Sequence, residues 1–294
     1  MKTSTELHTC PFCDHAESDI YRTGQICKEP ARGTRDFCRC RECAMIYPQP
    51  RIDLRETTRY WEAADEISDS YEDPMVLLSR LHALAVLLRR YVKINDIKHS
   101  LDIGASSGRL CHFLETIGVE SYGLEPQREA VRVGQGKGLK IFRGIFPDQM
   151  PPELGSRSYG LITAIEALYY FNNLRKALEK VRSLLSDGGI FFIQCHHGDS
   201  PYYSQGNSLF SRYGDYVQCI PTVSSLTSCL HKTGFIVEQC LPVPRSRLER
   251  VMLAMGFFQG SVVRGEVSPE TIRWSSSADR IIMIAKKRQG KEIC

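Results

Sequence analysis

The chain has 294 residues, enough for one large α/β domain and a small additional module. A hydrophobic fraction of 42% and a charged fraction of 24% are ordinary for a globular protein and argue against a disordered chain. The net charge is only +4, and residues 1–60 hold ten Lys and Arg against nine Asp and Glu. Because a surface that follows phosphates needs a larger positive excess, this balance argues against nucleic acid as a partner.

The N-terminal residues are polar and lack the apolar core of a signal peptide. The longest apolar run, Leu81–Leu88, contains a histidine and is too short to span a bilayer. We therefore expect a cytoplasmic protein that does not enter a membrane. A reducing compartment keeps thiols free, so the twelve cysteines need an explanation other than disulfides.

Two Cys-x-x-Cys pairs stand near the N-terminus, Cys10 with Cys13 and Cys40 with Cys43. The 26 residues between the pairs leave room for a hairpin. Zinc takes four ligands at tetrahedral corners, and two such turns supply four thiolates. Around fifty residues bury little core, and a bound metal adds folding energy. The spacing predicts that residues 1–50 form a module held by structural zinc.

The cysteines also allow two other interpretations, a different set of zinc ligands and a redox-active dithiol. Cys38 is an alternative ligand to Cys40, and Cys27 is a possible additional one. A redox-active dithiol normally follows an apolar strand and opens a helix, whereas Asp14–Ser18 begins no amphipathic pattern. Four thiolates would also leave zinc no open position for a substrate. The favoured hypothesis is therefore a structural site.

Residues 51–98 are expected to form a helical linker that covers the cofactor site. Two prolines in Tyr47–Arg51 disfavour regular structure and are expected to end the cysteine module. From about Leu54 to Val92 leucines recur at helical spacing, and Asp73-Pro74 is typical of a helix start.

Beyond residue 98, strands and helices alternate, which predicts an α/β fold with a mostly parallel sheet. The expected strands are Ser100–Ile103, Ser121–Leu124, Lys140–Arg143, Tyr159–Ile165, Ile190–Gln194, Phe235–Cys240 and Arg280–Lys286. The expected helices are Arg109–Ile117, Gln127–Lys137, Leu174–Leu185 and Ser224–Thr233. A turn is expected at Ser186–Gly189, before the fifth strand.

The turn after the first strand lies within Leu101–Gly108. Gly104 permits a tight turn, and Gly108 lets the next helix start close to the strand. Glu125 follows seventeen residues after Gly108, just past the second strand, where a carboxylate can accept hydrogen bonds from both hydroxyls of a ribose. This pattern indicates a cofactor that contains adenosine, bound across the strand ends.

The turn does not favour a dinucleotide. A pyrophosphate site usually has three glycines, and Ser106 stands where the middle one would be. Asp102 precedes the turn, which suits a cationic methionine group better than a pyrophosphate. A cofactor without phosphate is therefore expected.

At these positions the chain resembles the class I S-adenosylmethionine-dependent methyltransferases. The first motif of that family resembles Leu101–Gly108, and its ribose-binding acid corresponds to Glu125 in Gly123–Pro126. The loop that covers adenine resembles Gly144–Asp148, and the fourth-strand motif resembles Tyr159–Leu168. Ser186–Ile193 is similar to the turn and strand that follow.

The resemblance covers residues 99–240 and implies a seven-stranded Rossmann-like methyltransferase fold whose last strand is antiparallel. Its domain would span residues 99–294, with acceptor-site insertions near 196–222 and 242–279. The residues that the resemblance places at S-adenosylmethionine are Asp102, Gly104, Ala105, Ser106, Gly108, Glu125, Pro126, Ile145, Phe146, Ala164, Ile165 and Glu166.

Together with the cysteine module, the chain resembles bacterial methyltransferases that carry an N-terminal zinc ribbon. That group includes sugar C-methyltransferases and other enzymes of small metabolites, which implies a small-molecule acceptor for O-, N- or C-methylation. The sugar enzymes have a large further C-terminal domain that is not part of these 294 residues. A ribosomal-RNA methyltransferase and a noncatalytic binding protein are the alternatives.

Candidate catalytic residues follow the fourth and fifth strands. His196 and His197 stand at the end of the fifth strand, and histidine titrates near neutral pH, as a general base requires. The alternative is that they only satisfy loop hydrogen bonds. Tyr170 replaces a histidine common in the family. The apolar stretch Val251–Phe258 fits a lid, a core helix or a homodimer contact.

Overall fold

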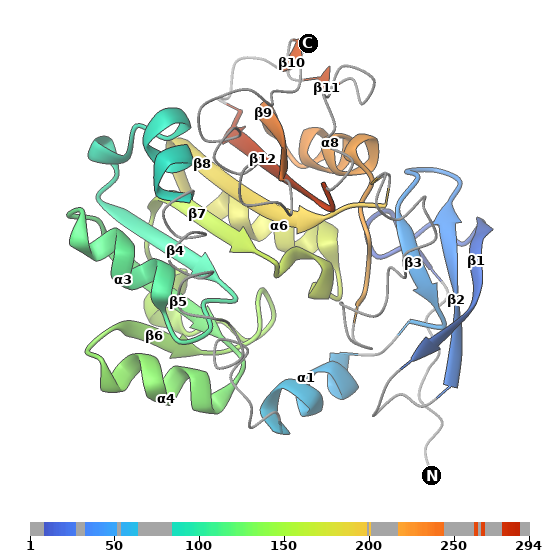
Figure 1. The fold of residues 1–294 in the computed structure, drawn as a ribbon, viewed down its shortest axis with the longest axis horizontal. Helices are drawn as coiled ribbons and strands as arrows, with labels where there is room; N and C mark the ends of the chain where they lie inside the picture. Colours follow the sequence, from blue (N-terminus) through green and yellow to red (C-terminus); the bar gives the residue numbers. More distant parts are fainter. Residues whose placement is uncertain are drawn as a thin grey trace.

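In a computed structural model the chain forms a small three-stranded module beside a large α/β domain (Figure 1). The structure describes residues 9–27, 33–51, 54–63, 84–198, 200, 217–243, 262–263, 266–267 and 278–288. Within these ranges no helix is long and apolar enough to cross a membrane. Asp73-Pro74, Val251–Phe258 and most of the two expected acceptor-site insertions lie outside the described residues.

The N-terminal module is an antiparallel sheet in the order β1 (Ser18–Cys27), β2 (Gly33–Cys40) and β3 (Ile46–Gln49). β1 and β2 form a hairpin between the two cysteine pairs. The expectation that Tyr47–Arg51 has no regular structure was wrong for its first part, because Pro48 lies in β3 opposite Phe37. β3 is an edge strand, where a missing proline N–H is tolerated.

The large domain is built on a seven-stranded sheet in the order β6-β5-β4-β7-β8-β12-β9. β12 is antiparallel to both of its neighbours, and the other six strands run in one direction. The strands are β4 (His99–Ile103), β5 (Glu120–Glu125), β6 (Lys140–Arg143), β7 (Tyr159–Ile165), β8 (Leu185–His196), β9 (Phe235–Val243) and β12 (Arg280–Lys287). This confirms the expected fold, including the antiparallel last strand. A two-residue pair, β10 (Val262–Val263) with β11 (Glu266–Val267), lies outside this sheet.

One strand begins earlier than the sequence predicts. Leu185 pairs with Tyr159 and Ile190 with Leu161, so the two strands are out of step between these pairs. The expected turn Ser186–Gly189 is therefore a bulge within β8. A bulge leaves its extra residues unpaired, which explains why the sequence there looks like a turn.

Helices cover both faces of the sheet. One face packs α6 (Leu174–Leu184) and α8 (Val223–Lys232) into a core that also includes the cysteine module. The other face packs α3 (Arg109–Thr116) and the helical residues 84–91. The remaining helical elements are α1 (Leu54–Ala63), η2 (Ile94–Asp96), α4 (Arg128–Gly136), α5 (Pro152–Gly155) and η3 (Leu168–Tyr170).

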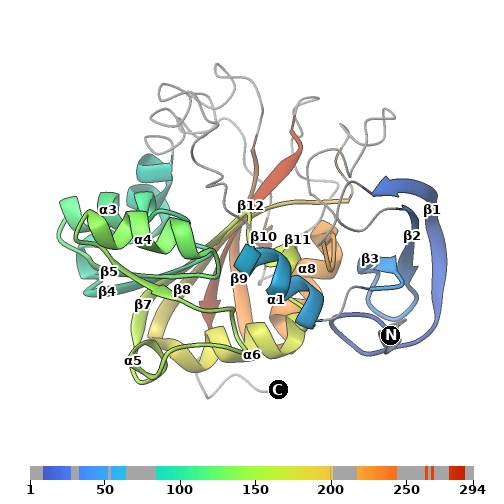
Figure 2. The ribbon, with the colours of Figure 1, turned by 90° about the horizontal axis from the view of Figure 1, so that it is seen from below.

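The two helices of the first face start where the sequence supplies caps. The Asn173 side chain accepts a hydrogen bond from the amide of Lys176 at the start of α6. Thr222 and Ser225 form a reciprocal capping box at the start of α8. Figure 2 shows α8 between the sheet and the cysteine module.

The carboxyl ends of the parallel strands meet at one edge of the sheet, as such strands must. β4, β5, β7 and β8 end there, and antiparallel β12 begins there because Arg280 pairs with His196. Every side chain that the sequence assigns to cofactor or acceptor stands at or near this edge.

Candidate active site and cysteine cluster

The turn after β4 has the backbone that its glycines predict. Gly104 has φ +78°, and a Cβ there would lie 2.8 Å from the Cβ of Ala167. Ser106 has φ +47°, in the left-handed region that a middle glycine would adopt without strain. The amides of Gly104 and Ala105 both donate to the Leu124 carbonyl of β5, at 2.9 and 3.2 Å. The turn is thus fixed to the neighbouring strand.

Glu125 ends β5 and is buried against this turn. Its Oε2 accepts a hydrogen bond from the Ser106 amide at 2.8 Å, and its Oε1 accepts one from the Gln127 amide at 2.9 Å. A carboxylate has about four acceptor positions, so orientation by two amides is compatible with further bonds from two hydroxyls. Glu125 is therefore held in one orientation at the switch point of the sheet.

Two other polar groups of the turn are buried. The Ser106 hydroxyl oxygen has no hydrogen-bond partner among the described residues. Asp102 is also buried, and its Oδ1 accepts a hydrogen bond from the Thr163 hydroxyl at 2.6 Å. An unsatisfied buried hydroxyl costs free energy, so the Ser106 side chain fits a bound polar group.

The other residues assigned to the cofactor differ in accessibility. Phe146 is buried and packs against Phe171, with ring centroids 5.6 Å apart, whereas Ile145 and Pro126 are partly exposed. Ala164 is completely buried in the core. Among the apolar residues assigned to the cofactor, Pro126, Ile145 and Ile165 have partly exposed side chains.

Glu166, directly after β7, is the centre of a charged cluster. Its Oε1 accepts hydrogen bonds from Gln194 at 3.0 Å and pairs with the Arg280 guanidinium at 2.9 Å. Its Oε2 accepts a hydrogen bond from the Tyr169 hydroxyl at 3.1 Å and lies 3.2 Å from His196 Nε2. The Glu166 carboxylate thus has four polar neighbours. The backbone of Glu166 has a positive φ of +57°.

His196 is nearly inaccessible and lies between two acceptors. Nε2 faces the Glu166 carboxylate, and Nδ1 is 3.1 Å from the carbonyl oxygen of Asp279. Both neighbours are oxygen acceptors, so the ring can donate a hydrogen bond to either of them, and to both if it is protonated. Arg280 Nη1 pairs with the buried carboxylate of Asp279 at 3.2 Å.

His197 and Tyr170 have different surroundings. His197 is fully buried, and desolvation lowers its pKa to about 3, so its ring is neutral at neutral pH. Burial raises the pKa of Tyr170, which keeps its phenol protonated. The Tyr170 ring packs edge-on against Trp61 of α1, with centroids 5.1 Å apart, and against Tyr169 at 4.6 Å.

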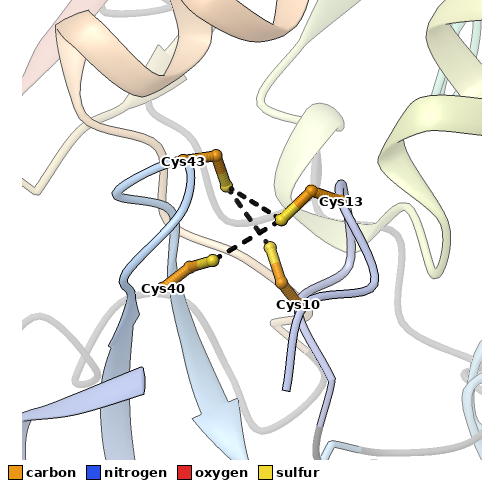
Figure 3. A group of neighbouring side chains, drawn as sticks. All are labelled: Cys10, Cys13, Cys40 and Cys43. Carbon is orange, nitrogen blue, oxygen red and sulfur yellow. Dashed lines mark hydrogen bonds between the residues drawn. The ribbon is translucent and has the colours of Figure 1, made fainter. Parts of the chain in front are cut away.

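The four cysteines of the two pairs converge in the N-terminal module (Figure 3). Their sulfurs all lie within 4.8 Å of one another. Cys10 and Cys43 are 3.5 Å apart, Cys13 and Cys40 are 3.5 Å apart, and Cys13 and Cys43 are 3.6 Å apart. Four sulfurs at about 2.3 Å from a tetrahedral zinc stand about 3.8 Å apart, so the cluster has the size of a zinc site.

The thiols of this cluster shift one another's pKa through their hydrogen bonds. Burial raises the pKa of Cys13 to about 12, the hydrogen bond to Cys10 raises the pKa of Cys43, and the hydrogen bond to Cys43 lowers the pKa of Cys10 to about 5. The alternative ligand Cys38 points elsewhere, because its sulfur contacts Gln49 Oε1 at 3.3 Å. The side chain of Cys27 lies outside the described residues.

Sequence reasoning missed several members of the site. Asp279 and Arg280 join the edge only because β12 inserts beside β8, and their local sequence carries no motif. Trp61 and Arg51 lie within the expected helical linker at residues 51–98, but no sequence motif marks either of them as a site residue. A buried arginine such as Arg51 has no sequence signal that distinguishes it from a surface arginine.

A family model described as a methyltransferase domain matches residues 77–239, more than half of the chain. The chain therefore belongs to this family, and it is a class I S-adenosylmethionine-dependent methyltransferase. No curated protein matches the sequence closely enough to indicate a relationship.

Solved structures share the fold at low sequence identity. The plantazolicin methyltransferase BamL, solved with a triazolic desmethylPZN analog and SAH, is 13% identical, with a TM-score of 0.56 over 80% of this chain and 95% of that one. A putative S-adenosylmethionine-dependent methyltransferase from Listeria monocytogenes is 14% identical, with a TM-score of 0.51 over 71% and 99%. A possible histamine N-methyltransferase from Thermotoga maritima is 16% identical, with a TM-score of 0.50 over 72% and 89%.

Proposed function

We propose that this enzyme methylates a small molecule of the natural-product class, at the edge of the sheet where β7, β8 and β12 meet. The proposed binding of S-adenosylmethionine rests on one observation, the orientation of the Glu125 carboxylate by the amides of Ser106 and Gln127. The natural-product class is suggested by BamL and by a second plantazolicin methyltransferase, BpumL, which is 14% identical with a TM-score of 0.51 over 80% of this chain and 91% of that one.

In this proposal the cofactor lies over the ends of β4 and β5. Glu125 accepts hydrogen bonds from the two ribose hydroxyls, and the buried Ser106 hydroxyl donates to the amino-acid portion. Gly104 and Gly108 let the backbone approach closely. Ile145 contributes apolar contact to adenine, and residues 164–166 contribute through their backbone because the Glu166 carboxylate is already engaged.

S-adenosylmethionine supplies a methyl group bound to a sulfonium, and the protein must align it with the acceptor. Alignment of two bound reactants is worth on the order of 7–11 kcal/mol. Tyr170 and Trp61 form an aromatic wall on the acceptor side, contributed by the segment after β7 and by α1. Such a wall suits a flat, partly apolar acceptor.

We assign His196 a role other than that of general base. Because both nitrogens of His196 face acceptors, we propose that His196 holds a proton and orients Glu166. The low pKa of His197 makes it a weak base. An acceptor that needs no histidine base, such as a neutral amine, then fits best.

This hypothesis has a kinetic test. If His196 were the base, turnover would fall as pH drops through about 6.5, and His196→Gln would lose about 10²–10⁴-fold in rate. We expect a loss of less than about tenfold, with the same pH profile in the variant and the parent. A loss of 10²-fold or more that removes the acidic limb would restore His196 as the base.

We further propose a structural zinc ion bound by Cys10, Cys13, Cys40 and Cys43, in a module that spans residues 1–50. The sulfur separations and the absence of Cys38 from the cluster support this ligand set. In the same scheme, residues 51–98 form a cover and residues 99–294 form the methyltransferase domain.

Transfer of labelled methyl from S-adenosylmethionine into fractionated cell extract tests the proposed function. We expect label in the small-metabolite fraction that depends on the active protein and is reduced in the Glu125→Ala variant. Label confined to the RNA fraction would overturn the small-molecule assignment. The unchanged extract without enzyme is the control.

A further inference from the structure

The cysteine module contacts the methyltransferase domain next to the acceptor side. We infer that the module, through Arg51 and Arg175, holds the acceptor-side segment Leu168–Leu174 in place, so that metal binding controls this segment and leaves cofactor binding unchanged. This inference rests on the zinc site proposed above. Both arginines are positioning residues, because they act on the segment and not on the reacting atoms.

Arg51 is a buried arginine at the seam between the two parts. Its Nη1 donates to the carbonyl of Thr9, the residue before the first cysteine ligand, at 3.1 Å. Its Nη2 donates to the carbonyl oxygen of Asn172 and approaches the Asn172 side-chain oxygen at 3.3 Å. A buried guanidinium needs hydrogen-bond acceptors, so Arg51 links the backbone at Thr9 to the backbone at Asn172.

The first Cys-x-x-Cys turn also contacts the start of α6. The amide of Leu174 donates to the carbonyl of Pro11 at 2.9 Å. Nε of Arg175 donates to the carbonyl of Phe12 at 3.0 Å, and its guanidinium lies 4.6 Å from the centroid of the Phe12 ring. Pro11 and Phe12 are the two residues between the ligands Cys10 and Cys13. A metal that fixes this turn therefore fixes the carbonyls that α6 uses at its N-terminus.

A second route leads from β3 to the same segment. Ile46 and Ile220 exchange two backbone hydrogen bonds, at 3.3 and 2.7 Å. The next residues back along the chain, Gln218 and Cys219, donate their amides to the Tyr169 carbonyl at 2.8 and 3.3 Å. The module thus contacts the segment directly at Asn172 and Leu174, and indirectly at Tyr169 through residues 218–220.

The segment Leu168–Leu174 contains side chains of the proposed acceptor site, so its contact with the cysteine module is relevant to function. Tyr169 donates to Glu166, and Tyr170 packs on Trp61, so a shift of the segment moves the acceptor-side wall. The cofactor turn is fixed instead by Leu124 and Glu125 of β5. Loss of metal should disturb the contacts of Tyr169 and Tyr170, and it should leave the contacts between the cofactor turn and β5 intact.

The test uses the full chain with Trp274→Phe, which leaves Trp61 as its only tryptophan. Metal content, hydrogen exchange at the Leu174 amide, Trp61 emission and S-adenosylhomocysteine affinity are measured before and after chelation. We expect chelation to speed exchange at Leu174 at least tenfold and to shift Trp61 emission to the red. Cofactor affinity should change less than twofold.

Arg175→Met separates the inference from the zinc proposal, because Arg175 does not belong to the cysteine cluster. We expect it to keep the metal and the cofactor affinity while exchange at Leu174 rises about threefold or more, with partial recovery in Arg175→Lys. Arg51→Lys is a second variant at the seam. Glu179→Gln, an exposed position on the same helix, is the matched control and should leave the metal, exchange at Leu174 and cofactor affinity unchanged.

The outcomes distinguish the two proposals. A parent without metal would refute the zinc site, and the Arg175 variants would still test the coupling. Metal released by chelation with unchanged exchange at Leu174 and unchanged Trp61 emission would overturn the inference while the zinc site stands. A large loss of cofactor affinity in Arg175→Met would also overturn it, because the effect would then not be confined to the acceptor side.

Discussion

The proposed cofactor half and the proposed acceptor half of the catalytic edge are built in different ways. The cofactor half uses the turn at residues 104–108 and Glu125, which lie close in sequence on adjacent strands. The acceptor half gathers Arg51, Trp61, His196 and Arg280, which are spread over most of the chain. The proposed cofactor half thus depends on local structure, whereas the proposed acceptor half depends on how distant elements pack.

The largest expected effect comes from the cysteine cluster. Replacing Cys13 with Ser should abolish binding of one metal ion per chain and expose the amides of residues 9–50 to exchange, because the module has little core of its own. Metal analysis and hydrogen exchange measure this. Cys38→Ser is the matched control and should keep the metal. Metal kept by the Cys13 variant but lost by the Cys38 variant would mean that the ligand set is different.

A smaller effect is expected from the charged cluster on the acceptor half. Arg280→Met removes the guanidinium that pairs with the buried carboxylate of Asp279 and with Glu166, which should lower the free energy of unfolding by about 3–5 kcal/mol. Lys286→Met on the same strand removes an exposed pair with Glu238 and should cost about 1 kcal/mol or less. Denaturant unfolding of both variants measures the difference. Equal costs would show that the cluster adds no more than a surface pair.

The acceptor half should also be sensitive to acid. His197 has a pKa of about 3 when folded and about 6.5 when unfolded, so between these values the unfolded chain binds the extra proton. Stability is therefore lost as pH falls from about 6.5 towards 3, by about 2 kcal/mol at pH 5. The variant His197→Gln should lack this part of the pH dependence. Identical pH curves for parent and variant would contradict the assignment.

The turn after β4 and the position of Glu125 beside it were predictable because their signals are local. The glycine turn and Glu125 have fixed spacing, and strands such as Tyr159–Ile165 show as short apolar runs. The spacing of the Cys-x-x-Cys pairs likewise predicts that their four sulfurs lie close together, as they do in the structure. The order of the sheet places Arg280 beside His196, a relation between residues 84 positions apart that no local pattern contains. Pro48 in β3 escaped prediction because an edge position, which tolerates proline, is a property of the sheet.

Calorimetry with S-adenosylhomocysteine on the parent and the Glu125→Ala variant tests the central claim most directly. In the proposed complex, the Glu125 carboxylate accepts hydrogen bonds from the ribose hydroxyls, and the Ser106 and Gln127 amides orient it. Its loss should weaken binding by about 1.5–3 kcal/mol, the cost of hydrogen bonds to a charged group. Equal affinity in the two proteins would contradict the placement of the cofactor at this edge of the sheet.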